Sequence, residues 1–585
     1  MICRLRFHIC SNLAVACVLL GACERSEVDS SEMAKARIEL ARGDAHSARL
    51  HLDHVRQQGL PAQELVVDFA EAALLDGDFE TAREWLESAD FSQGSRAHGF
   101  LLLGRVEMAD NNLAAAGQAF DQSYRSAPDN PDLWVEIGRL RYRGGEQLQA
   151  VQAVNRALEI DPVNREALLF RAQLVRDALG MKTAARILGD AVEIHPDDVD
   201  LRVELAATLG DGGYAAEALR VLRGNDGEAV STPRGIFVQA VLAARGGSFR
   251  LARDLLARSM LVEEGMASAQ ILSAIIDLQD ENYANAVLTL DRLYAVQPDN
   301  QRVRDLLAYG LLRSGSEQEL VRRFAKAASA RGASAYLRTL VGRAYEALGD
   351  RHRAAVFLDL AAAQYAGLVP LYMVETVKNA SGPDGMIGIQ TRDFVRNAIA
   401  SGDTISGVER ARDFARRFPG SADALALLGD AELVQGNRTA ARDAYEKSAQ
   451  IRRSWVLIER MMRVSNSPSD ARRIIESYVR EHPMNGEAAA TLADGFAAEG
   501  EWERAVLLLD HAMKSGMARV PWVVAARSIA ADRLGDRPGA TFYALAAYQL
   551  QPMSPHAVSA LIAVLPDGDA KREELEAKLR SLTMR

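Results

Sequence analysis

A 34-residue internal repeat is the feature that most restricts how this 585-residue chain can fold. The segments 131–164 and 165–198 align without a gap, and the same frame runs unbroken over 29–368 as ten units. Five further units follow, with a four-residue shortening inside the series: 388–421, 422–451, 452–485, 486–519 and 521–554. A unit of this length buries its apolar face only against its neighbours. We therefore expect a stacked array instead of several independent globular domains.

Each unit has the pattern of two helices joined by a tight turn. Position 15 of the unit, between two apolar-periodic stretches, is glycine in eleven units and asparagine in two. A residue that ends a helix often needs a positive φ, which glycine adopts freely and asparagine tolerates. These turn residues are Gly43, Gly77, Gly145, Gly213, Gly247, Gly315, Gly349, Gly402, Gly436, Gly500 and Gly535, with Asn111 and Asn466.

Small residues recur at two other positions of the unit. Position 20, on the second helix, is alanine in thirteen units, and position 8, on the first helix, is alanine or glycine in twelve. Small side chains at both places let two helices pack at close distance. A proline at position 32 in seven units ends the second helix before the next unit begins. The local exceptions are Leu320 and Gly407 at position 20 and Glu459 at position 8.

Repeat length, turn, small residues and proline together resemble the tetratricopeptide repeat (TPR) over nearly all of 29–554. The resemblance implies an all-α fold, a right-handed α-solenoid of about fifteen helix–turn–helix units with an extended concave surface. The insert 369–387 ends in a turn-rich stretch, so we expect it to divide an array over 29–368 from one over 388–554 as a kink or hinge. We expect the charged residues 555–585 to cap the array.

The N-terminal segment has the marks of a secretory signal peptide. Two arginines, a 12-residue apolar run over Ile9–Leu20 and small residues precede Cys23. The run is shorter than the roughly 20 apolar residues of a membrane-spanning helix. All four cysteines, Cys3, Cys10, Cys17 and Cys23, lie in this segment, which excludes a disulfide framework across the repeats.

Leu20-Gly21-Ala22-Cys23 resembles the bacterial lipobox. The resemblance implies removal of residues 1–22, lipidation of Cys23, a short tether over 23–28 and a periplasmic protein anchored in a membrane. Glu24, where aspartate commonly signals inner-membrane retention, favours the outer membrane. The alternative is an ordinary signal peptide cut near Ala22.

No catalytic motif stands out in the sequence. The only histidine cluster, His46, His51 and His54, lacks a further converging ligand, so we expect exposed histidines and no metal site. HExxH, P-loop, GxSxG and dinucleotide-binding patterns are absent from the sequence. The formal net charge of −10 argues against nucleic-acid binding by the repeats. We predict a protein without enzymatic activity or cofactor.

A binding surface is predicted from the TPR resemblance. In that family, positions 2, 5, 9, 12 and 13 of the first helices line the concave groove. Guanidinium groups there can hold carboxylates of an acidic peptide or a uronate-bearing polysaccharide. The alternative is that these are ordinary solvated arginines. Over 97–198, the groove positions include Arg105, Arg139, Tyr142, Arg143, Gln173 and Arg176.

Three classes of function fit these features. The segments GACERSE (21–27) and SSEMAKARIELARGDAHSARLHL (30–52) resemble the opening of PrsT-type TPR lipoproteins of exosortase (PEP-CTERM) systems. The plan is also similar to AlgK-type exopolysaccharide-export lipoproteins. We therefore predict a lipid-anchored scaffold that binds protein partners of the cell envelope. The alternatives are an outer-membrane assembly factor for β-barrel proteins and an accessory activator of peptidoglycan or glycan enzymes.

Overall fold

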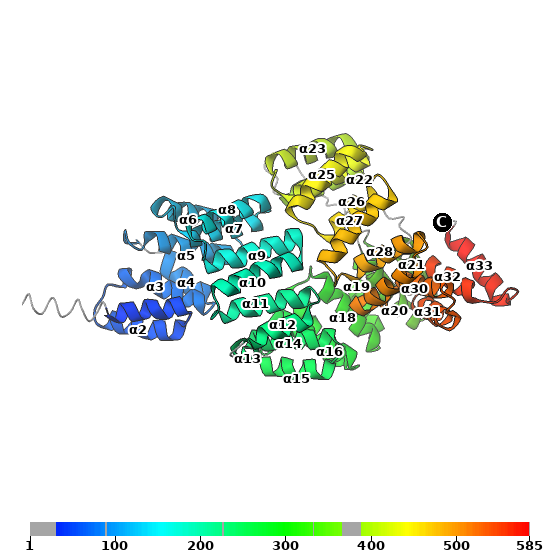
Figure 1. The fold of residues 1–585 in the computed structure, drawn as a ribbon, viewed down its shortest axis with the longest axis horizontal. Helices are drawn as coiled ribbons and strands as arrows, with labels where there is room; N and C mark the ends of the chain where they lie inside the picture. Colours follow the sequence, from blue (N-terminus) through cyan, green and yellow to red (C-terminus); the bar gives the residue numbers. More distant parts are fainter. Residues whose placement is uncertain (1–30, 88–90, 225–226, 331–332, 366–387, 584–585) are drawn as a thin grey trace, which may run out of the picture. The chain divides into compact units, whose positions relative to one another are not determined.

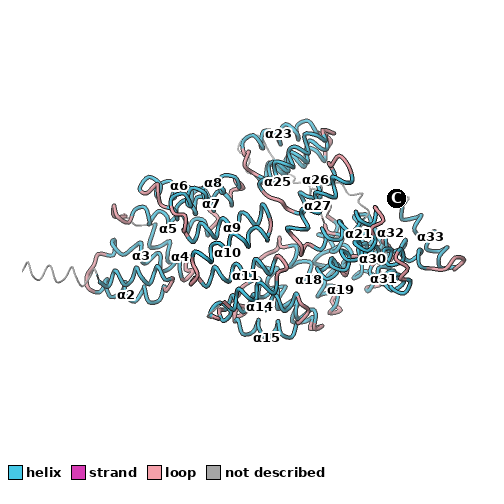
Figure 2. The backbone as a smooth tube through the Cα atoms, in the orientation of Figure 1, coloured by secondary structure: helices cyan, strands magenta, loops and turns pink. Residues whose placement is uncertain are grey.

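The computed structural model describes residues 31–87, 91–224, 227–330, 333–365 and 388–583. Within these ranges every regular element is a helix and no strand occurs, so the all-α prediction is confirmed (Figure 2). The predicted leader with Cys23 and the predicted insert 369–387 lie outside the described residues.

The chain forms two compact units, residues 1–171 and 172–585. The first unit holds a helix over 31–42 and the following elements (Figure 1): α2 (Ala45–Gln57), α3 (Ala62–Leu75), α4 (Phe79–Glu87), α5 (Arg96–Ala109), α6 (Leu113–Ser126), α7 (Pro131–Arg143), α8 (Gln147–Ile160) and the first part of α9 (Arg165–Leu179). The division lies within α9, inside the predicted ten-unit array.

The second unit carries the remaining helices, which flank the insert in two groups. Those before it are α10 (Met181–Ile194), α11 (Val199–Asp211), α12 (Ala215–Arg223), α13 (Glu228–Ser231), α14 (Pro233–Arg245), α15 (Phe249–Ser259), α16 (Ala267–Gln279), α17 (Tyr283–Val296), α18 (Gln301–Arg313), α19 (Glu317–Ser329), α20 (Ala335–Ala347) and α21 (Arg351–Tyr365). Those after it are α22 (Gly388–Ala400), α23 (Thr404–Arg417), α24 (Ala422–Val434), α25 (Arg438–Ile451), α26 (Trp455–Arg463), α27 (Pro468–Glu481), α28 (Gly486–Ala498), α29 (Trp502–Ala512), the π-helical turn η1 (Met513–Met517), α30 (Pro521–Arg533), α31 (Arg537–Leu550), α32 (Pro555–Val564) and α33 (Ala570–Thr583).

The turn predicted at position 15 is present in the structure. All eleven glycines have φ between +74° and +89°. Asn111 also has a positive φ, of +60°. The prediction for Asn466 is wrong, because Asn466 is not among the residues with positive φ; the hydroxyl of Ser465 bonds the carbonyl of Met462 there instead. Glu281 occupies position 15 of its unit with φ +60°, without being glycine or asparagine.

Three of the glycines at position 8, Gly104, Gly342 and Gly429, admit a large side chain from the second helix of the same repeat, and Gly138 admits Phe170 from the next repeat. A Cβ built on Gly104 would lie 2.2 Å from the ring of Phe120, and one on Gly429 would lie 2.3 Å from the ring of Tyr445. Twelve of the thirteen position-20 alanines are buried, as Ala150 with no exposed surface shows, and Ala471 is partly exposed. The close helix packing predicted from the small residues is confirmed.

Polar residues at position 34 fix where several of the first helices begin. The side chains of Asn130, Asp198 and Ser334 accept hydrogen bonds from backbone N–H groups in the first turn of α7, α11 and α20. Such N-caps satisfy donors that the helix itself leaves unpaired. The helices α7, α9, α11, α14, α16, α18 and α20 begin at intervals of 34 residues, and α16 does so after Met266, whose side chain makes no capping hydrogen bond.

The C-terminal helix covers the end of the second unit. Leu575 of α33 is buried, and Leu579 and Leu582 pack with it against a cluster that includes Val558 and Leu561 of α32. The outer side of α33 carries its charged residues, as a capping helix requires. None of the helices that the structure describes is both long and apolar enough to cross a membrane.

Candidate interaction surfaces

In the first compact unit two of the predicted arginines, Arg105 and Arg139, are paired with carboxylates of the chain itself. The Nε of Arg105 donates to Glu136 Oε1 at 3.0 Å, and Arg139 Nη1 donates to the same oxygen at 2.8 Å. Arg139 Nη2 also donates to Glu166 Oε2 at 2.6 Å. Glu136 is buried, with 4% of its surface exposed, so this network lies between the helices. The guanidinium charge at this part of the groove is therefore largely neutralised internally.

The electrostatics of Arg139 follow from this pairing. Burial alone would lower its pKa, but the charges of Glu136 and Glu166 outweigh burial and raise the pKa of Arg139. Burial would likewise raise the pKa of Glu166, and Arg139 and Arg165 lower it below its usual range. Each partner thus holds the other in its charged form.

The pairing recurs with the repeat. Arg37 Nε donates to Asp68 Oδ1 at 3.0 Å, just as Arg105 donates to Glu136. In both cases the arginine stands at position 9 and the acid at position 6 of the next unit. Successive first helices pack side by side in a solenoid, so this offset places opposite charges together. We name these pairs the inter-repeat ladder.

The other predicted groove residues of the first unit lie near the end of α7. Arg143 Nη1 donates to the carbonyl of Met108. The ring of Tyr142 meets that of Phe170 edge-on, with centroids 6.4 Å apart. These contacts fix both side chains against neighbouring helices.

Gln173 and Arg176 belong to the part of α9 in the second unit. Gln173 is exposed, and Arg176 Nη1 lies 3.7 Å from Glu204 Oε1. The structure thus joins Arg105 and Arg139 through Glu136, and Arg176 shares Glu204 with Arg234, whose Nη2 lies 3.2 Å from Glu204 Oε2. Ligand binding by the six residues stays a prediction.

Later groove positions in the second unit contact its C-terminal helices. The guanidinium of Arg519 lies 4.6 Å from the ring centroid of Tyr309, which stands at position 9 in α18. Arg343, at position 9 in α20, donates from Nη2 to the carbonyl of Leu550 at 3.0 Å. Part of the predicted concave surface is therefore occupied by the chain itself.

The groove side of the C-terminal helices holds a buried acid. Tyr445 donates its hydroxyl to Asp430 Oδ1 at 2.8 Å, and Arg460 Nη2 lies 2.8 Å from Asp430 Oδ2. Burial raises the pKa of Asp430, and the nearby guanidinium of Arg460 opposes that shift. This arrangement stabilises the packing of α24, α25 and α26 and offers no free charge to a ligand.

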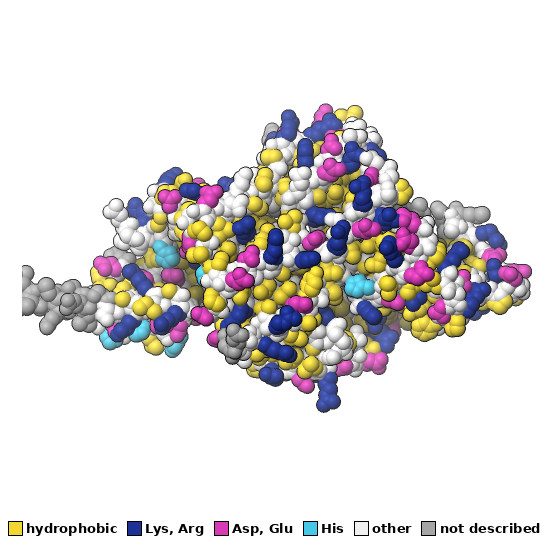
Figure 3. Space-filling view, in the orientation of Figure 1, with side chains coloured by type: hydrophobic (Ala, Val, Ile, Leu, Met, Phe, Trp, Pro, Cys, Tyr) yellow, Lys and Arg dark blue, Asp and Glu magenta, His cyan; other side chains and the backbone are white. Residues whose placement is uncertain are grey.

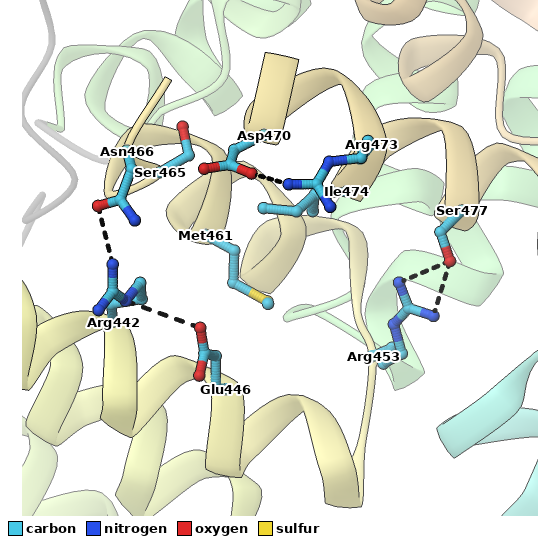
Figure 4. Close-up of a pocket in the computed structure, with 10 residues that line it drawn as sticks. All are labelled: Arg442, Glu446, Arg453, Met461, Ser465, Asn466, Asp470, Arg473, Ile474 and Ser477. Carbon is cyan, nitrogen blue, oxygen red and sulfur yellow. Dashed lines mark hydrogen bonds and ion pairs between the residues drawn. The ribbon is translucent and has the colours of Figure 1, made fainter. Parts of the chain in front are cut away.

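A cleft of about 540 Å³ opens between α25, α26 and α27, where the sequence predicted no site. It has charged and polar side chains around Met461 (Figure 4). The signal that could have indicated it is the four-residue shortening just before 452–485. The cleft is lined by Arg442, Glu446, Arg453, Met461, Ser465, Asn466, Asp470, Arg473, Ile474 and Ser477.

Other surface features carry little specific chemistry. On the face shown in Figure 3, lysine and arginine lie intermixed with aspartate and glutamate. His51 Nδ1 lies 2.8 Å from Glu32 Oε2. Across the described part of the chain, no group of three or more His, Cys, Asp or Glu side chains is placed to hold a metal ion.

Comparison with known families identifies the repeat. A family model described as tetratricopeptide repeat matches residues 101–165 and 392–454. The fold is a tetratricopeptide-repeat solenoid. The two matched stretches lie on either side of the insert, so TPR sequence patterns occur in both predicted arrays.

Two curated proteins resemble short stretches of this chain. Protein adenylyltransferase fic-1 of Caenorhabditis elegans is 38% identical over 64 residues, which are 11% of this chain and 13% of that protein. Superkiller protein 3 of Schizosaccharomyces pombe is 27% identical over 106 residues, which are 18% of this chain and 8% of that protein. The chain therefore matches only a small part of the length of either relative.

Solved TPR-like structures are also similar. One, described as a human IFIT1 dimer with PPP-AAAA, is 17% identical with a TM-score of 0.37, over 66% of this chain and 90% of that one. Another, the APC/C hetero-tetramer Cut9-Hcn1, is 13% identical with a TM-score of 0.25, over 92% of this chain and 96% of that one.

Proposed function

We propose that this TPR protein is a lipid-anchored scaffold of the periplasm, without catalytic activity, that holds proteins of a cell-envelope system together. The observation that carries the proposal is that helix–turn–helix repeats stack within each of the two compact units. Solenoids present long surfaces, and TPR repeats suggest protein partners. Many arginines of these helices form ion pairs with carboxylates of the same chain. Partner binding in this proposal is therefore spread over several faces of the protein and does not depend on one charged groove.

The sequence before residue 31 supports the anchor. Its apolar run ends in Leu20-Gly21-Ala22-Cys23, and acyl chains on Cys23 would hold the chain at a membrane without a spanning helix. The opening helix supports a role in exopolysaccharide export or PEP-CTERM sorting, through its likeness to PrsT-type and AlgK-type lipoproteins.

The test is crosslinking in cells, followed by purification from membranes and identification of the captured proteins. A Cys23→Ser variant is treated in parallel. We expect polysaccharide-export or sorting proteins with the wild type, and their loss with the variant. Capture of barrel-assembly proteins would instead support a function in outer-membrane protein assembly. Capture of peptidoglycan enzymes, together with a rise in their activity when the purified chain is added, would support a function in enzyme activation.

A further inference from the structure

The cleft between α25, α26 and α27 owes its shape to a shortened repeat. The helix α26 has 9 residues, whereas the equivalent α24 and α28 have 13 each. Four residues are missing from the preceding unit, so residues 452–454 leave the helix and serve as the connection. Arg452 is accordingly extended, with φ −149° and ψ 128°, and Ser454 caps α26 by accepting from the N–H of Leu457.

This connection holds Arg453 firmly in place. Its backbone N–H donates to the carbonyl of Asp177 at 3.1 Å, within the second unit. The next residue, Ser454, is fixed by its capping bond to Leu457, at 3.3 Å. Arg453 therefore extends into the cleft from a backbone that is tied down on both sides.

The three arginines that line the cleft differ in how closely carboxylates and other acceptors contact them. Arg442 has Glu446 at 3.7 Å and Asn466 at 2.8 Å, and Arg473 is paired with Asp470. Arg453 has only two long hydrogen bonds, each of 3.5 Å, to the Oγ of Ser477.

Among the residues that the structure describes, none forms an ion pair with Arg453. The cleft thus offers a guanidinium, that of Arg453, whose charge no described carboxylate balances through an ion pair.

The floor of the cleft is apolar. Figure 4 shows Met461 between Arg442 on one side and Arg453 on the other, with Ile474 close to it. Both apolar side chains are partly exposed. A guanidinium fork binds a carboxylate through two parallel hydrogen bonds, and a thioether adapts to aliphatic side chains of varied shape. The lining therefore combines a carboxylate-binding group with a surface for an aliphatic group.

We propose that this cleft docks an extended segment of a partner protein in which an acidic and an aliphatic side chain lie two positions apart, on the same face of the segment. Arg453 binds the carboxylate, and Met461 and Ile474 contact the aliphatic group. The cleft lies between two second helices, α25 and α27, so the site is separate from the concave groove predicted for the first helices. The proposal rests on the scaffold function, since it names the chemistry of one partner.

The test is calorimetric titration of the full-length chain carrying Cys23→Ser with a blocked synthetic peptide in which leucine and glutamate take turns at every second position, with serine between them, so that both face the cleft. Two control peptides replace glutamate by glutamine or leucine by serine. We expect binding of the first peptide and binding roughly tenfold or more weaker for each control. Equal binding of the glutamine peptide, or no binding of the first peptide at millimolar concentration, would overturn the proposal.

Arg453→Gln and Arg453→Lys identify the group responsible, and Arg416→Gln, an exposed arginine of α23, is the matched control. We expect both Arg453 variants to bind roughly tenfold more weakly, since lysine lacks the planar fork, and Arg416→Gln to bind like the parent. Unchanged melting temperatures would show that all variants fold.

Equal loss in Arg416→Gln, or no loss in Arg453→Gln, would overturn the assignment. A different result is that an oligouronate binds through Arg453 and the leucine–glutamate peptide does not. The ligand of the cleft would then be a glycan and not a protein segment. Because no envelope protein takes part, failure here leaves the crosslinking result for the scaffold unaffected.

Discussion

The repeat can be recognised from the sequence because single positions in each copy require particular backbone conformations or small residues. Each position-15 glycine has a positive φ that other residues adopt only at a cost. Each position-8 glycine admits a ring or branched side chain, such as Phe120 or Leu358. These requirements are local and recur every 34 residues, so pattern alone predicts them. At position 15, Glu281 and Asn466 do not follow the pattern. Glu281 has the positive φ although it is neither glycine nor asparagine, and Asn466 is asparagine but does not have a positive φ.

Replacing Glu281 by glycine should stabilise the hairpin of α16 and α17. Glu281 has φ +60°, and relief of this strain is worth about 1 kcal/mol, partly offset by the greater freedom of glycine in the unfolded chain. Hydrogen exchange of the α16 and α17 amides measures the local effect. Asn111→Gly, at the same φ of +60°, is the control and should gain less, because asparagine tolerates this region. Faster exchange in Glu281→Gly would contradict the explanation.

Replacing Gly429 by alanine should loosen the pair α24 and α25. The new Cβ would lie 2.3 Å from the Tyr445 ring, whose hydroxyl bonds Asp430, so the ring must move. Overpacking of this kind costs about 1–3 kcal/mol. Thermal unfolding should show the loss. Gly495→Ala in α28 meets no heavy atom within 4 Å and should instead gain about 0.5–1 kcal/mol. Equal effects of the two substitutions would argue against the close contact.

At the scale of helices and their pairs, the sequence predicts the spacing of elements well and their side-chain partners poorly. The N-caps at position 34 could have been recognised, because Asn130 and Ser334 are residue types that cap helices. The inter-repeat ladder could have been found by comparing position 9 with position 6 of the next unit. Taken without their neighbours, Arg105 and Arg139 suggest a ligand-binding site. In the structure, both arginines pair with the buried Glu136.

Substituting Glu136 by glutamine tests the ladder. Loss of the buried negative charge leaves Arg105 and Arg139 without a shared counter-charge, which should cost about 2 kcal/mol. Exchange of the α5–α8 amides should become faster. Glu159→Gln, whose partner Arg156 is exposed, should change stability by less than about 0.5 kcal/mol. If Glu136→Gln is equally silent, the ladder does not stabilise the first unit.

Glu459, one of the exceptions at position 8, predicts a pH dependence of stability. Burial, with repulsion from Glu487, raises the pKa of Glu459 to about 7. The folded chain therefore binds this proton more tightly than the unfolded chain, whose carboxyl titrates near 4.5. Its contribution to stability is greatest at low pH and is lost as the pH rises from 4.5 to about 7.

Glu459→Gln should flatten the fall in melting temperature between about pH 5 and pH 8, with little difference from wild type at the acidic end. Glu503→Gln, an exposed residue of α29, serves as the control and should leave the profile unchanged. Parallel profiles for wild type and Glu459→Gln would rule out the titration of Glu459 as the cause.

At the scale of the whole molecule, contacts distant in sequence decide which surfaces remain available. Within the second unit, Arg343 and Leu550 are joined across 207 positions, and Gly180 is approached so closely by Glu481 that a Cβ would lie 2.8 Å from its side chain. A repeat pattern describes only neighbouring units, so it could not predict these contacts or the division within α9. The cleft at Arg453 belongs to the same class, because a deletion in one unit reshapes the next.

The mass of the N-terminal peptide, taken from chain purified out of membranes, tests the anchored scaffold most directly. We predict a peptide that begins at Cys23 and carries acyl chains. We also predict that Cys23→Ser abolishes this peptide and releases the chain from the membrane fraction. A soluble chain whose first residue is another amino acid, or whose Cys23 is unmodified, would contradict the anchored scaffold.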